Sequence, residues 1–172
     1  MKILSAIACV AVLATGTAAS AAAPQPTKPV AASFYSGRWY EIARIPNAGQ
    51  RDCQAPTTQF VGTGTAFAVT QVCHKGSATG AAKTFNTKGR ILPSSNNAKF
   101  EMSFLGGIKK QEYWVLDTAA DGSWAIMATP GGNYVWLLSR KAVLPTAARD
   151  QIVARARTLG YRQKLEFPAQ AG

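Results

Sequence analysis

The side chains that could carry out covalent chemistry or hold a metal are few in this sequence. His74 is the one histidine, and it follows Cys73, while another cysteine, Cys53, lies upstream. The chain contains no Gly-x-Ser-x-Gly turn and no His-Glu-x-x-His pair, which are patterns that position a nucleophile or a zinc ion. Because a base, a nucleophile and a full ligand set are all missing, the sequence predicts no catalytic residue, no metal and no cofactor.

The two cysteines Cys53 and Cys73 are predicted to form a disulfide. The turn-forming run "GTGT" is centred near Thr63, and a hairpin folded there places position 53 opposite position 73. Facing residues of an antiparallel pair hold their Cβ atoms about 4.5 to 5.5 Å apart, close to bridging distance. A metal pair with His74 and a redox couple are the alternatives. Against them, two Cys and one His leave a closed zinc site one ligand short, and Cys-x-x-Cys is absent.

The chain is strongly basic. Its 172 residues include 19 Lys and Arg against 8 Asp and Glu, a formal net charge of +11. Such a surface favours solubility and attracts anionic headgroups or nucleic acid. The cations are scattered, without a basic run interleaved with aromatics, which argues against nucleic acid. Peripheral contact with an anionic membrane surface stays open.

The N-terminus is typical of a signal peptide. Lys2 is followed by an apolar run over 3–14 and by Ala19-Ser20-Ala21, which predicts a signal peptide over 1–21. The apolar run is shorter than the roughly 20 residues that span a bilayer, and Cys9 lies inside that run, which argues against lipidation. Residues 22–33 are rich in Pro and Ala and predict a flexible leader. The mature protein is therefore expected in the periplasm or outside the cell, with association with the outer membrane left open.

Short aromatic and β-branched segments separated by Gly, Asn, Asp or Pro predict an antiparallel meander. The predicted strands lie near 38–45, 57–62, 66–74, 83–92, 98–105, 111–118, 123–129 and 133–139. Alternation is clearest in "AKFEMSF", where Phe100, Met102 and Phe104 share one face. One helix follows, since Pro145 suits a first turn and Ile152 and Ala156 recur at helical spacing. A short extended piece begins at Lys164.

Eight antiparallel strands joined by short turns can close into a barrel whose interior holds side chains or one small ligand. The predicted fold is therefore all-β: an eight-stranded antiparallel up-and-down barrel with one C-terminal α-helix and a short final strand. It forms one domain over 34–168 with a tail at 169–172. An eight-stranded outer-membrane barrel is the alternative, but the terminal helix and the polar tail argue against it.

Three motifs in order resemble those of the lipocalin family. "SGRWYEIARIPN" resembles the Gly-x-Trp signature of the first lipocalin strand, especially in the bacterial branch and its apolipoprotein D relatives. "EYWVLD" and "YVWLLSR" resemble the second and third motifs. The resemblance covers about Phe34 to Phe167. The second motif departs from the family by carrying Gln111-Glu112 where Gly-Asp is common, and "NAGQRD" lacks the usual Phe, which leaves the shape of the barrel mouth undetermined.

The resemblance implies that Gly37, Trp39 and Arg140 form the closed end of the barrel. The guanidinium is expected across the indole, a contact worth about 0.5 to 2 kcal/mol, and Gly37 permits close backbone approach. Glu41 shares the face of Trp39. It would contact the headgroup of a ligand or hold a neighbouring strand in place. The second role is favoured because a buried carboxylate needs a partner.

The resemblance also implies that the barrel binds a small hydrophobic ligand, such as a fatty acid or lysophospholipid. Apolar pockets with few polar groups suit acyl chains. The chain is expected to be a monomer or weak dimer, and a filled core is the alternative for the residues expected to line the pocket. Those residues are Phe100, Met102, Phe104, Tyr134, Trp136 and Leu138, with Glu41.

Overall fold

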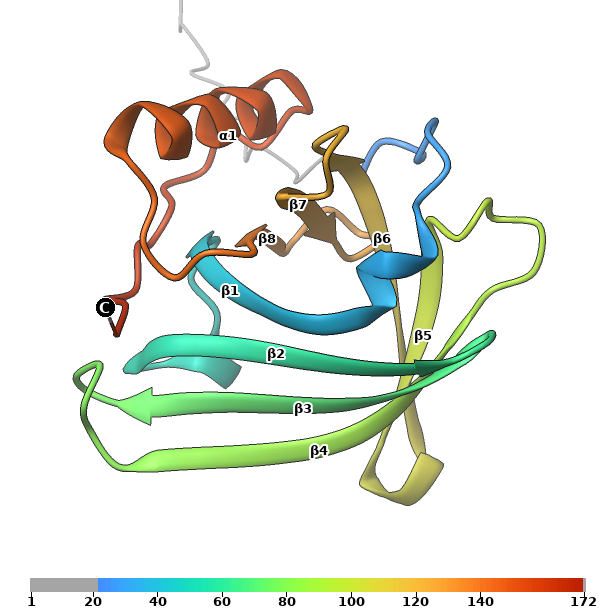
Figure 1. Ribbon diagram of the computed structural model, residues 1–172, viewed down its shortest axis with the longest axis horizontal. Helices are drawn as coiled ribbons and strands as arrows, with labels where there is room; N and C mark the ends of the chain where they lie inside the picture. The colour runs from blue at the N-terminus through green and yellow to red at the C-terminus, as the bar shows by residue number, and fades with distance from the viewer. Residues whose placement is uncertain (1–21, 172) are drawn as a thin grey trace, which may run out of the picture.

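The protein is a closed antiparallel β-barrel with one helix on its outer face (Figure 1). The computed structural model describes residues 22–171, so the predicted signal peptide lies outside the described residues. Each strand pairs with its neighbours in sequence, and β1 closes the ring by pairing with β8. The strands are β1 (Ser36–Arg44), β2 (Cys53–Thr63), β3 (Ala66–Lys75), β4 (Ala82–Ile91), β5 (Lys99–Phe104), β6 (Lys109–Thr118), β7 (Trp124–Ala128) and β8 (Val135–Ser139). The predicted number and order of strands are confirmed.

The start of β2 is the largest difference from the predicted strand limits. The strand begins at Cys53 rather than Thr57, and it runs through Pro56. The β2–β3 register shifts between Gln54 and Thr57. A proline has no N–H for the ladder, and a bulge is one of the places in a sheet where proline is tolerated. Pro56 therefore marks an irregularity inside the strand and not its beginning.

The two ends of the barrel differ in what covers them. The turns that follow β2, β4, β6 and β8 lie at the end where Trp39 and Arg140 meet, which we call the closed end. The loops that follow β1, β3, β5 and β7 lie at the opposite end, which we call the mouth. Two short 3-10 helices, η2 (Ala48–Gln50) and η3 (Leu105–Gly107), belong to mouth loops, whereas η1 (Ala32–Tyr35) precedes β1 at the closed end.

Helix α1 (Thr146–Thr158) covers the outer face of β7 and β8 (Figure 1). Ile152 and Ala156 are buried against Ile126 and Leu137 of those strands. The predicted final strand is reduced to a single antiparallel bridge, Arg44 to Glu166. That bridge adds to the edge of β1, because the β1–β2 pairing stops at Tyr40 and leaves the last residues of β1 free on that side. None of the helices among residues 22–171 is both long and apolar enough to cross a membrane.

The Pro- and Ala-rich leader lies along the barrel. The Ala23 N–H donates to the carbonyl of Pro130 at 3.0 Å, and the Val30 N–H donates to Asn96 at 2.9 Å. Between them, the Lys28 ammonium lies 2.8 Å from the Asp117 carboxylate. Ala23 and Val30 are both buried. These contacts join the leader to the barrel at several points. They cannot be read from the amino-acid composition, which predicted a flexible segment.

Asp117 joins three parts of the molecule. This buried carboxylate on β6 accepts from Lys28 of the leader and from Arg155 of α1. Burial alone would raise the pKa of Asp117. The hydrogen bonds and charges of Lys28 and Arg155 outweigh that effect, so the pKa of Asp117 lies below its ordinary value.

We expect Asp117→Asn to lower the free energy of unfolding by about 1 to 2 kcal/mol at pH 7. The stabilisation by a carboxylate of lowered pKa is complete above its unfolded pKa of about 3.9 and is lost as pH falls through the folded value. Urea midpoints for the wild type and the variant should therefore converge below about pH 4. Asp150→Asn, which removes an exposed carboxylate on α1 paired with Arg149, is the control. The role of Asp117 would be contradicted if the urea midpoints of Asp117→Asn and wild type differed by the same amount from pH 7 down to pH 2.5, which is roughly a unit below the unfolded pKa.

Candidate functional site

The interior of the barrel is lined by alternate residues of each strand, and their burial changes along its length. Toward the closed end the inward-facing side chains are almost fully buried, and toward the mouth they are partly exposed. The buried group, which we call the floor cluster, contains Phe34, Tyr35, Trp39, Phe60, Phe67, Val69, Phe100, Met102, Val115, Ala125 and Leu138. Because protein interiors are close-packed, the closed half of the barrel is filled by its own side chains.

Two aromatic residues of η1 pack into the floor cluster from the closed end of the barrel. The rings of Phe34 and Phe60 have centroids 5.7 Å apart, and Tyr35 stacks on Phe67 at 4.9 Å. Gly89 makes room for this arrangement, since a Cβ at that position would lie 2.3 Å from the Phe67 ring. Burial raises the pKa of Tyr35 above its ordinary value, and its hydroxyl donates to the carbonyl of Asn97. The segment that joins the leader to β1 therefore supplies part of the core through η1.

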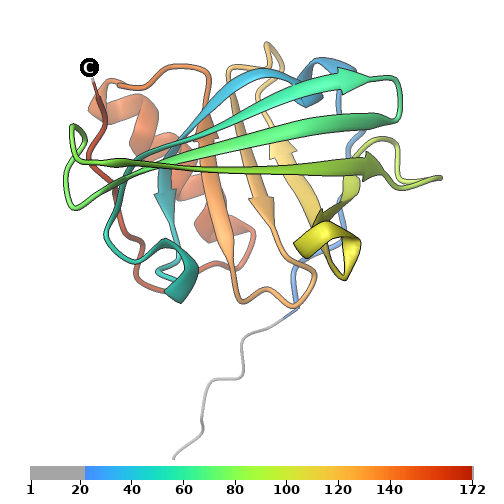
Figure 2. The same cartoon turned by 90° about the horizontal axis from the view of Figure 1, so that it is seen from below.

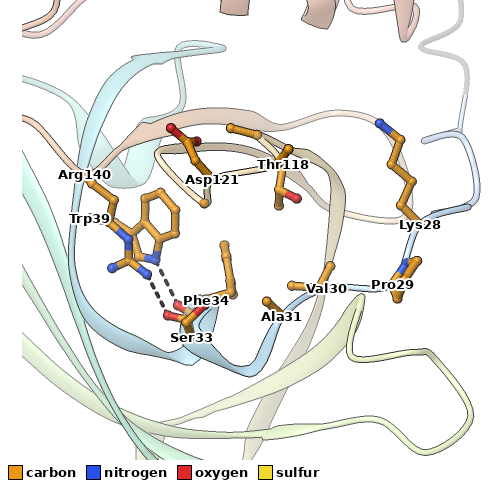
Figure 3. A pocket seen from close by; sticks show the side chains of 13 residues that line it. Lys28, Pro29, Val30, Ala31, Ser33, Phe34, Trp39, Thr118, Asp121 and Arg140 are labelled. Atoms are coloured by element: carbon orange, nitrogen blue, oxygen red, sulfur yellow. Dashed lines mark hydrogen bonds between the residues drawn. The ribbon is translucent and has the colours of Figure 1, made fainter.

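Trp39 and Arg140 meet at the closed end as the family resemblance implies (Figure 3). The guanidinium carbon of Arg140 lies 3.6 Å from the centroid of the indole. The indole N–H donates to the carbonyl of Phe34 at 2.9 Å. Gly37 has φ +75°, in the left-handed region that favours glycine, and a Cβ there would lie 3.4 Å from Arg140 Nη1.

Arg140 also acts as a hydrogen-bond donor to the backbone. Nη1 donates to the carbonyls of Ser36 and Arg38, and Nη2 donates to that of Ser33 at 2.7 Å. One guanidinium thus ties the end of β8 to the start of β1 and to η1. We call the Trp39–Arg140 pair the plug.

A half-open pocket of about 470 Å³ lies on the outer side of this plug (Figure 3). The leader from Lys28 to Phe34 forms one wall, the turn between β6 and β7 forms another, and Arg140 with Trp39 closes its base. Its only carboxylate among the lining residues is Asp121, which is exposed and bonded to the Ser123 N–H. The pocket lies between the leader and the β6–β7 turn. None of the residues predicted to bind the ligand lines it.

The mouth half of the barrel carries partly exposed aromatic side chains. Tyr113 stacks on Phe100 with centroids 5.4 Å apart, and Trp136 lies 5.7 Å from Tyr113. On the opposite side of β5, Phe85 and Phe104 are stacked at 5.7 Å. Burial raises the pKa of Tyr113 to about 12, so this phenol stays neutral and acts as an apolar surface with one polar tip.

A few polar side chains share the inward row near the mouth. The register pairs Gln71 of β3 with Thr58 of β2 and with Phe85 of β4, and it pairs Gln111 of β6 with Met102. A surface of aromatic rings with a small number of hydrogen-bonding groups is typical of sites for small amphipathic molecules. The mouth half is therefore the part of the interior with the chemical character of a binding site.

The residues predicted to line a pocket divide between the two halves. Phe100, Met102 and Leu138 are buried in the floor cluster. Phe104 and Trp136 are partly exposed at the mouth, and Tyr134 is exposed beside Trp136 at 6.0 Å. The structure therefore does not bring all six onto one accessible surface.

Sequence reasoning missed aromatic residues in both halves. Phe34, Tyr35, Phe60 and Phe67 of the floor were not predicted, and neither were Phe85 and Tyr113 of the mouth. The alternation Gln111, Tyr113, Val115 in β6 was a usable signal for Tyr113.

Glu41 lies between the two halves and is held by hydrogen bonds. Its carboxylate accepts from Arg44 Nη1 and from Gln50 Nε2, each at 2.7 Å. Gln50 belongs to η2, and its side-chain oxygen accepts from the indole N–H of Trp136 at 2.8 Å. Glu41 therefore ties the loop after β1 to the barrel wall, and both of its oxygens are occupied.

Arg44 is the centre of this arrangement and was not anticipated. Strict alternation from Glu41 would place Arg44 on the outer face, but the β1–β8 register shifts between Glu41 and Ala43. The bulge turns Arg44 toward the carboxylate, and the side chain is 0 % exposed. Its guanidinium also donates to the Glu166 carboxylate and to the carbonyls of Gln50 and Cys53.

The predicted disulfide between Cys53 and Cys73 is confirmed, with a Cα–Cα distance of 5.3 Å. The register behind the prediction is wrong, because the hairpin turns between Thr63 and Ala66 and Cys53 faces Lys75. The bulge in β2 brings the two cysteines together as diagonal neighbours. His74 bonds the carbonyl of Gly80 through Nδ1 at 2.9 Å, and no cluster of three metal-ligating side chains occurs within residues 22–171.

Comparison with known proteins agrees with this architecture. Residues 30–170 match the model of the lipocalin-like domain. Temperature-induced lipocalin-1 of Arabidopsis thaliana is 31% identical over 137 residues, which cover 74% of this chain and 72% of the relative. Outer membrane lipoprotein Blc of Vibrio cholerae is 24% identical over 143 residues, covering 80% and 82%.

Solved structures share the fold at lower identity. Insecticyanin from the tobacco hornworm Manduca sexta superposes with a TM-score of 0.69 at 19% identity, covering 88% of this chain and 87% of insecticyanin. The siderocalin Ex-FABP superposes with a TM-score of 0.57 at 16% identity, covering 81% and 97%. The domain match and the plant relative together show that this chain belongs to the lipocalin family.

Proposed function

We propose that the protein binds a single-chain lipid, a fatty acid or a lysophospholipid, in the mouth half of its barrel. Lipocalins bind small hydrophobic ligands and are generally binding or transport proteins. The proposal that a single-chain lipid binds in the mouth half rests on how the burial of the inward-facing side chains changes along the barrel. The floor cluster fills the closed half, and partly exposed aromatic side chains line the mouth half.

The chemistry of the mouth half suits an acyl chain with a polar end. Trp136, Tyr113 and Phe104 offer flat apolar surface, and burying it against a hydrocarbon is favourable by about 25 cal/mol per Å². A ligand that entered from the mouth would have its chain stopped by Phe100 and Met102 of the floor, because these side chains are already packed. Its polar end would then stay near the solvent and the exposed rim.

We further propose that this binding takes place in the cell envelope. The support is the signal-like N-terminus of the sequence and the similarity to a relative named as an outer membrane lipoprotein. Carriage or storage of the lipid, without chemical conversion, is the expected role.

Trp136→Phe tests the location of the ligand. An acyl chain that contacts this indole changes the polarity around it and its emission, so titration of wild type with palmitate or lysophosphatidylcholine should change the tryptophan fluorescence. In Trp136→Phe, binding measured by calorimetry should persist within about threefold, since phenylalanine keeps an apolar surface. Most of the fluorescence response should disappear.

Trp124→Phe is the matched control, because Trp124 packs in the outer cluster beneath α1 and its loss should leave the response intact. A full response in Trp136→Phe would place the ligand away from the mouth. Absence of binding of both lipids to wild type would overturn the proposed function.

A further inference from the structure

The turn between β5 and β6 exposes two large aliphatic side chains to solvent. Leu105 is 72% exposed and Ile108 is 89% exposed. Leu105 and the two glycines that follow it all have positive φ, so the chain turns tightly at the tip of the hairpin. Figure 1 shows this turn, in yellow, extending below the rest of the barrel, and in Figure 2, seen from below, it lies in front of the strands.

Two exposed lysines adjoin these aliphatic residues in sequence. Lys109 follows Ile108 directly, and Lys110, next along β6, lies 3.4 Å from the Glu101 carboxylate and remains more than half exposed. The exposed cations of the mouth loops and adjoining strand ends are Arg51, Lys75, Lys83, Lys109 and Lys110. Among the described residues of these segments, Asp52 is the exposed carboxylate that opposes them. The β5–β6 turn is thus apolar at its tip with two lysines directly after it, and the other exposed cations belong to other loops of the same mouth.

The residue before the apolar tip belongs to the interior of the barrel. Phe104, the residue before Leu105, faces inward and stacks on Phe85 of β4. Phe85 is itself partly exposed. Leu105 in the turn is therefore followed toward the interior by the stacked rings of Phe104 and Phe85 at the mouth.

We propose that this rim, defined by Leu105, Ile108, Lys109 and Lys110, docks on the surface of an anionic lipid bilayer. Aliphatic side chains on a protruding turn can enter the interface between headgroups and acyl chains, and lysines beside them gain from the negative surface potential. The charge of the rim selects an anionic surface over a neutral one. Docking would bring the mouth of the barrel against the membrane, where a single-chain lipid could pass from the bilayer to the mouth.

Docking and ligand binding are separate properties, and each can be measured without the other. The test of docking is co-sedimentation with vesicles of phosphatidylcholine alone or of equal parts phosphatidylcholine and phosphatidylglycerol. Leu105→Ser/Ile108→Ser removes the apolar tip, and Lys109→Gln/Lys110→Gln removes the charge. Val61→Ser/Val143→Ser is the matched control, because those two side chains are 57% and 61% exposed at the closed end.

Wild type should bind the anionic vesicles at least tenfold more tightly than the neutral ones, at low ionic strength. Each rim variant should weaken this binding by about tenfold or more, given a contribution of about fivefold per lysine near such a surface. The control should bind like wild type, and all variants should keep the palmitate affinity of wild type in solution. Thermal midpoints establish that the variants are folded.

Three results would overturn the proposal. Wild type could fail to bind anionic vesicles. The serine variant could bind them as wild type does, which would assign the attraction to the general basic charge. Sedimentation velocity could instead show a dimer that the serine variant abolishes, which would make the rim a contact between two copies of the chain.

Discussion

Replacing Arg44 by methionine is expected to lower the free energy of unfolding at pH 7 by about 3 to 5 kcal/mol. The side chain is 0% exposed and makes five hydrogen bonds, to Glu41, Glu166, Gln50 and Cys53. Removing one partner of a buried pair leaves a charge without compensation, which costs far more than the pair itself contributes. The loss should appear as a lower urea midpoint with an unchanged slope.

Arg38→Met is the matched control on the same strand, because Arg38 is exposed and surface substitutions of this kind change stability by about 0.5 kcal/mol or less. The double variant Glu41→Gln/Arg44→Met should recover part of the loss, since it also removes the uncompensated carboxylate. Equal midpoints for Arg44→Met and Arg38→Met would contradict the role assigned to Arg44.

The pH dependence of Arg44→Met gives an independent check. Burial raises the pKa of Glu41, while Arg44 and Gln50 act in the opposite direction. Without Arg44 the pKa of Glu41 should rise further. A carboxyl group whose folded pKa exceeds its unfolded value binds its proton more tightly in the folded state, so the folded state gains stability as pH falls through the folded pKa. The deficit of the variant should therefore shrink as pH falls from 7 toward about 4.3, the ordinary pKa of a glutamate in the unfolded chain.

Phe104→Asp is expected to weaken palmitate binding by about thirty- to hundredfold, or about 2 to 3 kcal/mol. Phe104 faces the interior at the mouth and stacks on Phe85. A carboxylate there would have to lose its hydration against the acyl chain, and it would also repel the carboxylate of the ligand. Because Phe104 is only partly buried, the folded barrel should tolerate the change.

Calorimetric titration measures this effect, and Phe167→Asp is its control. Phe167 lies about half exposed on the C-terminal segment, below the guanidinium of Arg149, so its substitution adds the same charge away from the mouth. Similar affinities for the two variants would exclude Phe104 from the site.

The barrel could be predicted from sequence because its determinants are local. Alternation such as that of Phe100, Met102 and Phe104, with turn residues at regular intervals, is enough to define strands and their order. The Gly37, Trp39 and Arg140 plug followed from motif resemblance, and the structure places the three residues together.

Two kinds of information were not local and could not be read from the sequence. The first is the position of bulges: one in β1 turns Arg44 toward Glu41, and one in β2 brings Cys53 to Cys73. The second is depth within the barrel. Strand period shows that Phe100 and Trp136 face inward. Only the packing of Phe34 and Tyr35 of η1 against Phe100 shows that Phe100 belongs to the floor cluster, whereas Trp136 belongs to the mouth half.

The most direct test of the central claim is the number of lipid molecules that the wild-type protein holds. Native mass spectrometry of the folded protein mixed with palmitate or lysophosphatidylcholine should show one adduct per chain, because the filled floor leaves only the mouth half for a ligand. The same adduct should be lost from Phe104→Asp at equal concentrations and retained by Phe167→Asp. A spectrum that shows only the unliganded mass with both lipids, at concentrations up to the millimolar range, would contradict the claim that this barrel binds single-chain lipids.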